Sequence, residues 1–169
     1  EAVEDEAYKM QSYSRVQKAF KNHLLFDSRL INGLNLVSID NSYYTFTYKQ
    51  LDFLKSEIDK GYPVVLMMHN PIHTDDLYHV MMFERKAGSA YSVGTPVELM
   101  KDYNERNYNA QQTDQPTRAF LDYLSQQTAV KAILTGHLHF TYETTLPCGI
   151  KQYIAGGGFE GCANEIEII

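Results

Sequence analysis

The stretch Ala132-Ile133-Leu134-Thr135-Gly136-His137-Leu138-His139 decides the fold class of this chain. Its apolar first half is typical of a buried β-strand, and Gly136 ends that strand just before two histidines. A strand that ends in this way brings two imidazole rings to the rim of a sheet, where ligands commonly bind in α/β proteins. Neutral imidazole is a ligand that zinc, iron and manganese accept. His137 and His139 are therefore candidate metal ligands.

A second buried strand is predicted at Val64–Met68, five apolar residues without alternation that end at His69-Asn70-Pro71. A helix is predicted before each of the two strands. The first helix begins at the capping box Thr47-Tyr48-Lys49-Gln50, and the second begins near Asp114. Two successive helix–strand units indicate parallel neighbours in an α/β sheet, whose carboxyl ends meet at one edge. We therefore expect His69 to join His137 at a metal site.

Each of these histidines also has a simpler interpretation, as a hydrogen-bonded polar residue at the start of a loop. That interpretation would be favoured for a single histidine. Gly-His-x-His after one buried strand, with His-x-Pro after the other, favours metal ligation instead. Asn70 either orients His69 from outside the coordination sphere or serves the turn before Pro71, and Gly136 is a second candidate for such a supporting role.

A long connection, residues 71–109, separates the two units. An insertion of this length at the ligand edge of a sheet is expected to shape a pocket. Within it, Thr95-Pro96-Val97-Glu98 is a further capping signal, which predicts a helix through about Tyr103. His73 and His79 flank two aspartates, and we expect them in a solvated loop rather than in a site.

The two ends of the chain give weaker signals. Residues 1–29 are expected to be a helical lead-in, because apolar side chains recur at helical spacing between Tyr13 and Leu25. Alternation from Leu30 to Ile39 around Asn32-Gly33 predicts a short β-hairpin. Beyond His139, strands are expected at residues 140–146 and 150–155, and alternation resumes at residues 166–168.

Composition limits the class of protein. The 169 residues are expected to form a single domain, 1–169. A net charge of −6 without a basic stripe argues against nucleic acid and anionic membranes as partners. No apolar run approaches the roughly 20 residues that span a bilayer, and the acidic start is unlike a signal peptide. Two cysteines are too few for a disulfide framework, which favours a cytoplasmic location.

Two of these segments, Val64–Pro71 and Ile133–His139, resemble the last two metal-binding blocks of the calcineurin-like metallophosphoesterases. The similarity extends to Leu36–Ser42, with Gln50-Leu51 in the helix that follows. Gly149–Gly158 is similar to a bacterial branch of that family. The resemblance covers roughly residues 30 to 169, and the ordered combination is far more specific than either motif alone.

The resemblance implies an α/β fold, in which this chain forms part of a four-layer α/β/β/α sandwich with a mixed sheet flanked by helices. It also implies two divalent metal ions, zinc, iron or manganese, that activate a water to hydrolyse phosphomonoesters or phosphodiesters. By position, His69 and His137 would bind one metal and His139 the other.

The family's remaining ligands come from Asp-x-His, Gly-Asp and Gly-Asn-His blocks, and none of these occurs in the sequence. Three imidazoles without a bridging carboxylate do little to offset the repulsion between two cations. We therefore expect the C-terminal portion of a phosphoesterase domain, with no catalytic residue of its own, inactive alone and binding at most one metal weakly. The missing N-terminal half is then its expected partner. The alternative is a non-catalytic binding or scaffold domain that retains the fold.

Overall fold

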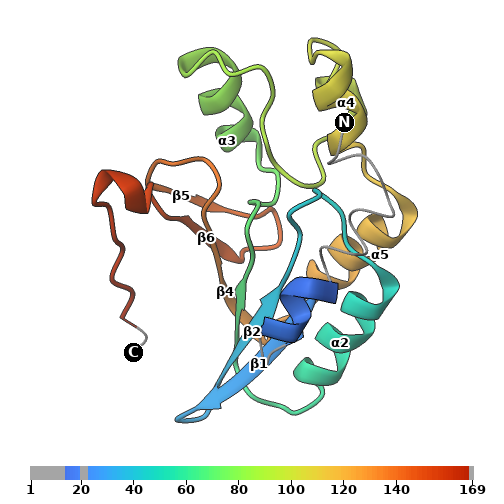
Figure 1. The fold of residues 1–169 in the computed structure, drawn as a ribbon, viewed down its shortest axis with the longest axis vertical. Helices are drawn as coiled ribbons and strands as arrows, with labels where there is room; N and C mark the ends of the chain where they lie inside the picture. The colour runs from blue at the N-terminus through green and yellow to red at the C-terminus, as the bar shows by residue number, and fades with distance from the viewer. Residues whose placement is uncertain (1–13, 20–22, 168–169) are drawn as a thin grey trace.

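The computed structural model describes residues 14–19 and 23–167. The centre of the fold is a six-stranded mixed sheet in the order β1-β2-β3-β4-β6-β5 (Figure 1). Strands β2, β3, β4 and β6 are parallel, and the edge strands β1 and β5 each pair antiparallel with their neighbour. The strands are β1 (Phe26–Ile31), β2 (Leu34–Ile39), β3 (Val64–Met67), β4 (Val130–Thr135), β5 (Tyr142–Thr145) and β6 (Lys151–Ile154).

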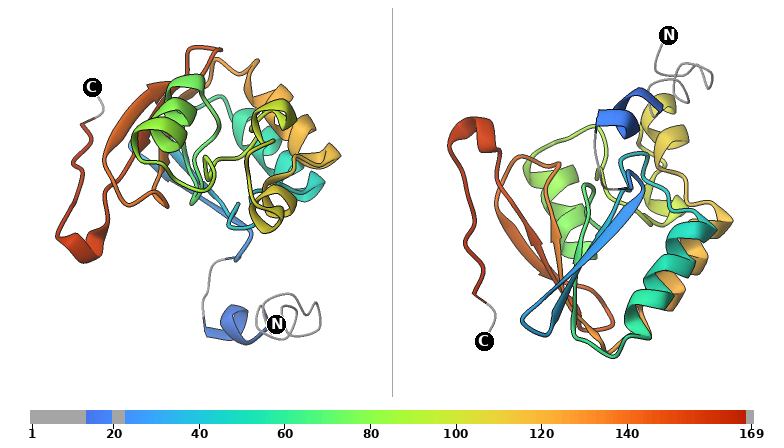
Figure 2. Two further views of the ribbon diagram at one scale, coloured as in Figure 1. Left: turned by 90° about the horizontal axis from the view of Figure 1, so that it is seen from above. Right: turned by 60° about the horizontal axis from the view of Figure 1, so that its bottom comes forward.

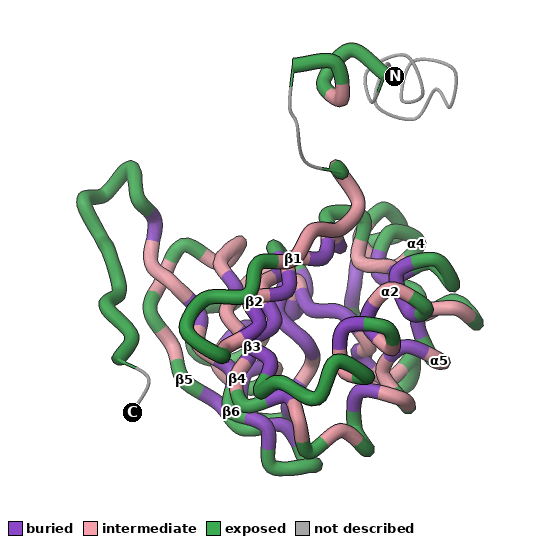
Figure 3. The backbone as a smooth tube through the Cα atoms, turned by 90° about the horizontal axis from the view of Figure 1, so that it is seen from below, coloured by how far each residue is buried: buried purple, intermediate pink, exposed green. Residues whose placement is uncertain are grey.

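Helices α2 and α5 lie side by side against one face of the sheet (Figures 1 and 2). The apolar side chains between these helices and the inner face of the strands form the main core. Figure 3 colours the backbone of the buried residues purple. The α/β fold with a mixed sheet flanked by helices is therefore confirmed. The helices are α2 (Tyr48–Ile58), α3 (Asp75–His79), α4 (Glu105–Gln111) and α5 (Gln115–Leu124), with a π-helical turn at Val80–Glu84 and 3₁₀ turns at Val97–Leu99 and Gly158–Glu160.

The other face of the sheet is only partly covered. Side chains on that face, such as Leu36, Met67, Ala132 and Leu134, are partly exposed in the register that pairs β2, β3 and β4. The second sheet of the four-layer sandwich that the resemblance implies is not among the described residues. What the structure shows is one sheet with two helices against a single face.

The capping box predicted at Thr47 is present, and it does more than begin α2. Gln50 Oε1 accepts a hydrogen bond from the Thr47 backbone N–H at 2.8 Å, and Thr47 Oγ1 accepts one from Gln50 N. The buried Gln50 amide also donates to the carbonyls of Leu25 and Asp40. The cap therefore fixes the end of β2 at the same time, which positions the loop that follows it.

The start of α5 fixes the other side of that loop. Asp114 accepts a hydrogen bond from Thr117 N, as expected for a helix N-cap, and Thr117 Oγ1 accepts one from Phe46 N at 2.8 Å. The Phe46 ring stacks on the fully buried Phe120 ring with centroids 3.8 Å apart. The segment between β2 and α2 is thus held by both helices that cover the sheet.

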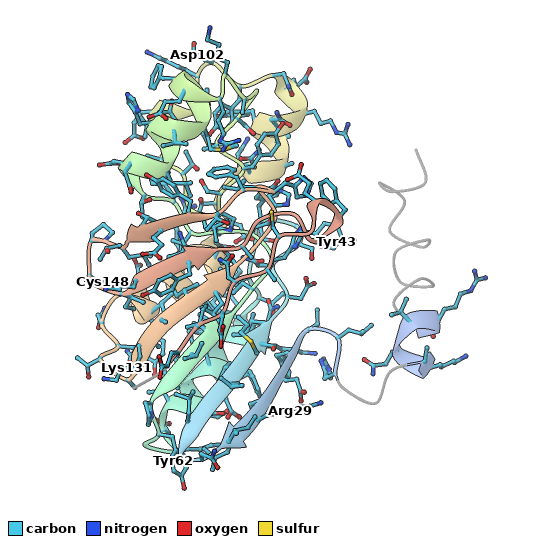
Figure 4. The ribbon with its side chains drawn as sticks, turned by 90° about the vertical axis from the view of Figure 1, so that its left-hand side faces the viewer. Arg29, Tyr43, Tyr62, Asp102, Lys131 and Cys148 are labelled. Carbon is cyan, nitrogen blue, oxygen red and sulfur yellow. The ribbon has the colours of Figure 1, made fainter. Side chains whose placement is uncertain are left out.

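The long insertion is more ordered than the sequence suggests. Its helices α3 and α4 stand at one end of the molecule, where Figure 4 labels Asp102, opposite the end that carries Tyr62. They enclose a second apolar cluster that includes Leu77 and Met100. The solvated loop expected between His73 and His79 is wrong, because residues 75–79 form α3 and His73 is mostly buried. The buried Leu77 belongs to a cluster that also includes Met100 and Ile154, which lie far away in the sequence.

The helix expected from Thr95 to about Tyr103 is also wrong. Only a single 3₁₀ turn forms, at Val97–Leu99. The Thr95 hydroxyl pairs with Ser92 Oγ at 3.0 Å instead of capping the turn, and Pro96 has an extended ψ of 135°. A true helix, α4, begins afterwards, where the Asn104 side chain accepts a hydrogen bond from the N–H of residue 107.

The ends of the chain differ from expectation as well. Residues 14–19 are helical, and residues 23–25 are not. Tyr13 and residues 20–22 of the expected helix lie outside the described residues, as do residues 1–12 of the lead-in. The hairpin around Asn32-Gly33 is confirmed, but β1 already begins at Phe26, inside the expected lead-in. Residues 161–167 form no strand, and residue 168 lies outside the described part. None of the described helices has the length and apolar character needed to cross a membrane.

Candidate metal centre

The structure brings His69 and His137 together at the carboxyl edge of the sheet. β3 and β4 are parallel neighbours, as the sequence predicts, with Met67 opposite Leu134. Their pairing continues beyond the strands, since Met68 N donates to Leu134 O at 2.9 Å and Gly136 N donates to His69 O at 3.1 Å. As a result, His137 Nδ1 lies 3.0 Å from His69 Nε2.

The turn after Gly136 separates the two histidines of the motif. His137 and His139 both have left-handed backbones, with φ of 68° and 60°, and Leu138 N donates to Gly136 O at 2.7 Å. His139 is exposed, and its ring lies edge-on to Phe159, with centroids 5.0 Å apart. His69 and His137 are thus paired, whereas His139 faces a different neighbour.

Tyr44 is a contact that the sequence did not suggest. Its hydroxyl lies 2.7 Å from His137 Nε2, so both ring nitrogens of His137 have a partner. The Tyr91 ring also approaches His137, with centroids 6.0 Å apart. Tyr44 lies in the loop after β2, whose carboxyl end meets the same edge of the sheet. The position of that strand end was a usable signal, but no sequence pattern marks the tyrosine itself.

A pair of buried asparagines holds His69 in place. Asn41 Oδ1 accepts hydrogen bonds from the backbone N–H groups of His69 and Asn70, at 3.0 and 2.8 Å. Asn41 Nδ2 donates to Asn70 O at 2.8 Å, and Asn70 Nδ2 donates to Asn41 O at 2.6 Å. Asn70 is 0% exposed, and its Oδ1 has no hydrogen-bond partner among the described residues. The asparagines therefore join the ends of β2 and β3 in addition to forming a turn before Pro71.

The electrostatics of the pair keep His137 neutral. Burial, with smaller contributions from the nearby His69 and His139, lowers the pKa of His137 to about 4. Burial also raises the pKa of Tyr44 well above its usual range, with smaller contributions from Tyr91 and Tyr103. At neutral pH the phenol is therefore protonated and the His137 ring carries one N–H and one lone pair, which is the form that binds a cation.

The donor geometry of the pair fits two ligands of one cation. Nitrogens about 2.05 Å from a shared ion lie about 2.9–3.4 Å apart at bond angles of about 90–110°, and the observed separation is 3.0 Å. A dinuclear centre does not fit, because within residues 14–19 and 23–167 no three His, Cys, Asp or Glu side chains come together around a metal position. No reaction step is therefore assigned to a second metal.

The other candidate residues contribute no side chain to the histidine pair. Gly136 contributes its backbone N–H, and a Cβ there would meet nothing within 4 Å, so the position does not depend on glycine. His73 is mostly buried, and burial lowers its pKa against the opposing effect of Asp75, whose Oδ1 lies 3.4 Å from His73 Nε2. Cys148 and Cys162 are exposed free thiols.

The chain is similar to known proteins in its fold, at low sequence identity. No protein-family model matches the chain, and no curated protein matches it. Among solved structures it is similar to a dimetal phosphatase from Danio rerio, with 11% identity and a TM-score of 0.46, over 83% of this chain and 51% of that one. It is also similar to a Staphylococcus aureus protein described as a 5′-nucleotidase in complex with alpha-ketoglutarate, with 16% identity and a TM-score of 0.38, over 78% of this chain and 23% of that one. The chain thus spans about half the length of the first and about a quarter of the second. At these scores neither similarity assigns an activity to this chain.

Proposed function

We propose that this chain is part of a metal-dependent phosphoesterase that hydrolyses phosphomonoesters or phosphodiesters. The observation that carries the proposal is the 3.0 Å approach of His137 Nδ1 to His69 Nε2 beyond two parallel strands. In this proposal the pair binds one divalent cation, and His139 would serve a neighbouring one only where another polypeptide supplies the carboxylates that a second cation needs. The bound metals, of which zinc, iron and manganese suit imidazole, would polarise the phosphate and activate a water.

In this proposal the described residues of the chain hold and orient the cation but supply no carboxylate to it. Asn41 and Asn70 fix the backbone of His69, and Gly136 links that segment to His137. Without a bridging carboxylate, two cations at close range would repel each other with little compensation. We therefore expect the chain alone to bind one metal weakly and to turn over little or no substrate. A polypeptide that carries the Asp-x-His, Gly-Asp and Gly-Asn-His blocks is the partner that would complete the site.

One observation favours a second candidate, a non-catalytic binding or scaffold domain. The described part of the chain holds no group of three metal-ligating side chains. A domain that kept its fold and two histidines after losing its chemistry would have this arrangement. The two candidates differ in whether the histidine pair binds a divalent metal at all.

Metal titration of the 169-residue chain separates the candidates. Zinc and manganese are titrated calorimetrically into the wild type and into His69→Ala, His137→Ala and His139→Ala. The exposed His79, whose Nδ1 lies 3.5 Å from Glu84, provides a control as His79→Ala. We expect one weakly bound ion in the wild type and in the control, with uptake lost in His69→Ala and His137→Ala.

Two results would contradict the proposal. Unchanged metal uptake in all three site variants would remove the site assignment and favour the scaffold domain. Hydrolysis of p-nitrophenyl phosphate or bis-p-nitrophenyl phosphate by the chain alone, above the rate of His137→Ala, would show that the described site is already sufficient for catalysis.

A further inference from the structure

The contacts of His137 form a chain of three side chains. Tyr44 Oη lies 2.7 Å from His137 Nε2, and His137 Nδ1 lies 3.0 Å from His69 Nε2. A neutral imidazole carries one N–H and one lone pair, so the proton on His137 sets the direction of both hydrogen bonds. One nitrogen of the ring must donate while the other accepts.

In both directions one proton lies between His137 Nδ1 and His69 Nε2, and the directions differ in which ring carries it. If Tyr44 donates to Nε2, the proton lies on His137 Nδ1, so His137 must change tautomer before that nitrogen can bind a cation. If Tyr44 accepts from Nε2–H, the His137 Nδ1 lone pair accepts the Nε2–H of His69, and a cation has to displace only the proton of the exposed His69. A free histidine side chain prefers the tautomer with its proton on Nε2. Both His137 and His69 have this tautomer only when Tyr44 accepts the hydrogen bond from His137 Nε2–H. Metal-binding histidines commonly donate their other N–H to such a partner, which fixes the tautomer and the ring orientation.

We propose that Tyr44 is a positioning residue whose phenol oxygen accepts the Nε2–H of His137 and so leaves His137 Nδ1 as a lone pair facing His69 Nε2. The inference rests on the proposed metal site and adds the residue that prepares it. Tyr44 acts through His137, with no contact to the cation itself.

Unusual backbone conformations around His137 support a specific role for the contact between Tyr44 and His137. Among the described residues six non-glycine positions have a positive φ, and four of them gather here: Tyr44 at 62°, Tyr91 at 50°, His137 at 68° and His139 at 60°. A bulky residue in the left-handed region carries a conformational cost, which persists only where the surroundings enforce it. Two contacts enforce the left-handed backbone of Tyr44. Its N–H donates to Asn41 O at 2.8 Å, and its ring packs against the main core.

The tautomer of His137 can be read directly by long-range proton–nitrogen NMR on the nitrogen-15-labelled 169-residue chain. The metal-free wild type is compared with Tyr44→Phe, which keeps the ring and its packing but removes the oxygen. Tyr48→Phe, at an exposed position of α2, is the matched control. We expect a protonated Nε2 on His137 in the wild type and the control, and a mixture of tautomers in Tyr44→Phe. A proton on Nδ1 in the wild type, or an unchanged spectrum in Tyr44→Phe, would overturn the proposal.

Zinc titration of the same three proteins adds a second measurement. Loss of the partner that orients a metal-binding histidine should weaken zinc binding about 10- to 100-fold in Tyr44→Phe, with no change in Tyr48→Phe. If the wild type binds zinc although its metal-free His137 is protonated on Nδ1, the role of Tyr44 is refuted and the metal site is left standing. A wild type that binds no zinc would refute the proposed function, while the metal-free spectra would still decide which way Tyr44 bonds.

Discussion

Replacing Asn41 with alanine should destabilise the whole fold, because its side chain satisfies three backbone groups at once. Its Oδ1 accepts from the N–H groups of His69 and Asn70, and its Nδ2 donates to the carbonyl of Asn70. Asn41 is 1% exposed, so water cannot simply replace these bonds. Each buried group left without a partner costs about 1–3 kcal/mol. With two fully buried groups and one partly buried one, Asn41→Ala should cost about 3–5 kcal/mol, a large share of the about 5–15 kcal/mol that holds a typical domain together.

Urea unfolding followed by circular dichroism measures this loss. With a slope of about 2 kcal/mol per molar urea, the midpoint should fall by about 2 M. The control is Asn109→Ala on the exposed surface of α4, which should change the free energy of unfolding by no more than about 0.5 kcal/mol. A loss below about 1 kcal/mol in Asn41→Ala would refute the view that this amide holds the ends of β2 and β3 together.

Three further predictions concern stability. Thr47→Ala removes the hydroxyl of the α2 capping box and should cost about 1 kcal/mol in urea unfolding; an unchanged midpoint would mean that Gln50 alone suffices. Phe120→Ala empties the position stacked on Phe46 and should cost about 3–5 kcal/mol, measured in the same way; a cost below that of Thr47→Ala would contradict the central place of this stack. His137 has a folded pKa of about 4 against an ordinary value of 6.5, so the unfolded chain binds protons first and stability should fall as pH drops from 7 toward 4. After allowance for the partial exposure of His137, the free energy of unfolding at pH 5 should be about 1 kcal/mol lower than at pH 7. In His137→Gln the free energy of unfolding should fall less steeply as the pH drops. Equal pH dependence in the two proteins would show that His137 is not the cause.

Local signals in the sequence predicted the elements that depend on neighbouring residues. The Asn32-Gly33 hairpin, the Thr47 capping box and the end of β4 just before Gly136 are confirmed, because turn geometry, capping and apolar runs act within a few residues. The approach of His69 to His137 followed from a topological rule, that parallel neighbours end at one edge.

The errors lie where distant residues decide the outcome. Thr95 looked like a helix cap, but its hydroxyl pairs with Ser92. The segment around Leu77 looked like a solvated loop, yet it packs into a second apolar cluster. Tyr44 reaches His137 across 93 positions of sequence, and nothing near it in the chain marks that contact. Propensity and capping patterns cannot report contacts that only the folded chain creates.

The pairing of β3 and β4 continues beyond the strands themselves, through Met68 N to Leu134 O and Gly136 N to His69 O. The two histidines therefore lie where the hydrogen bonding between the central strands ends, and not on independent loops. Amide hydrogen exchange at Met68 and Gly136 should then follow global unfolding, as in the core strands, and not fast local fraying. For this chain, the spacing of its histidine pair is a property of the whole sheet, and heat or denaturant should abolish it only when the sheet itself melts.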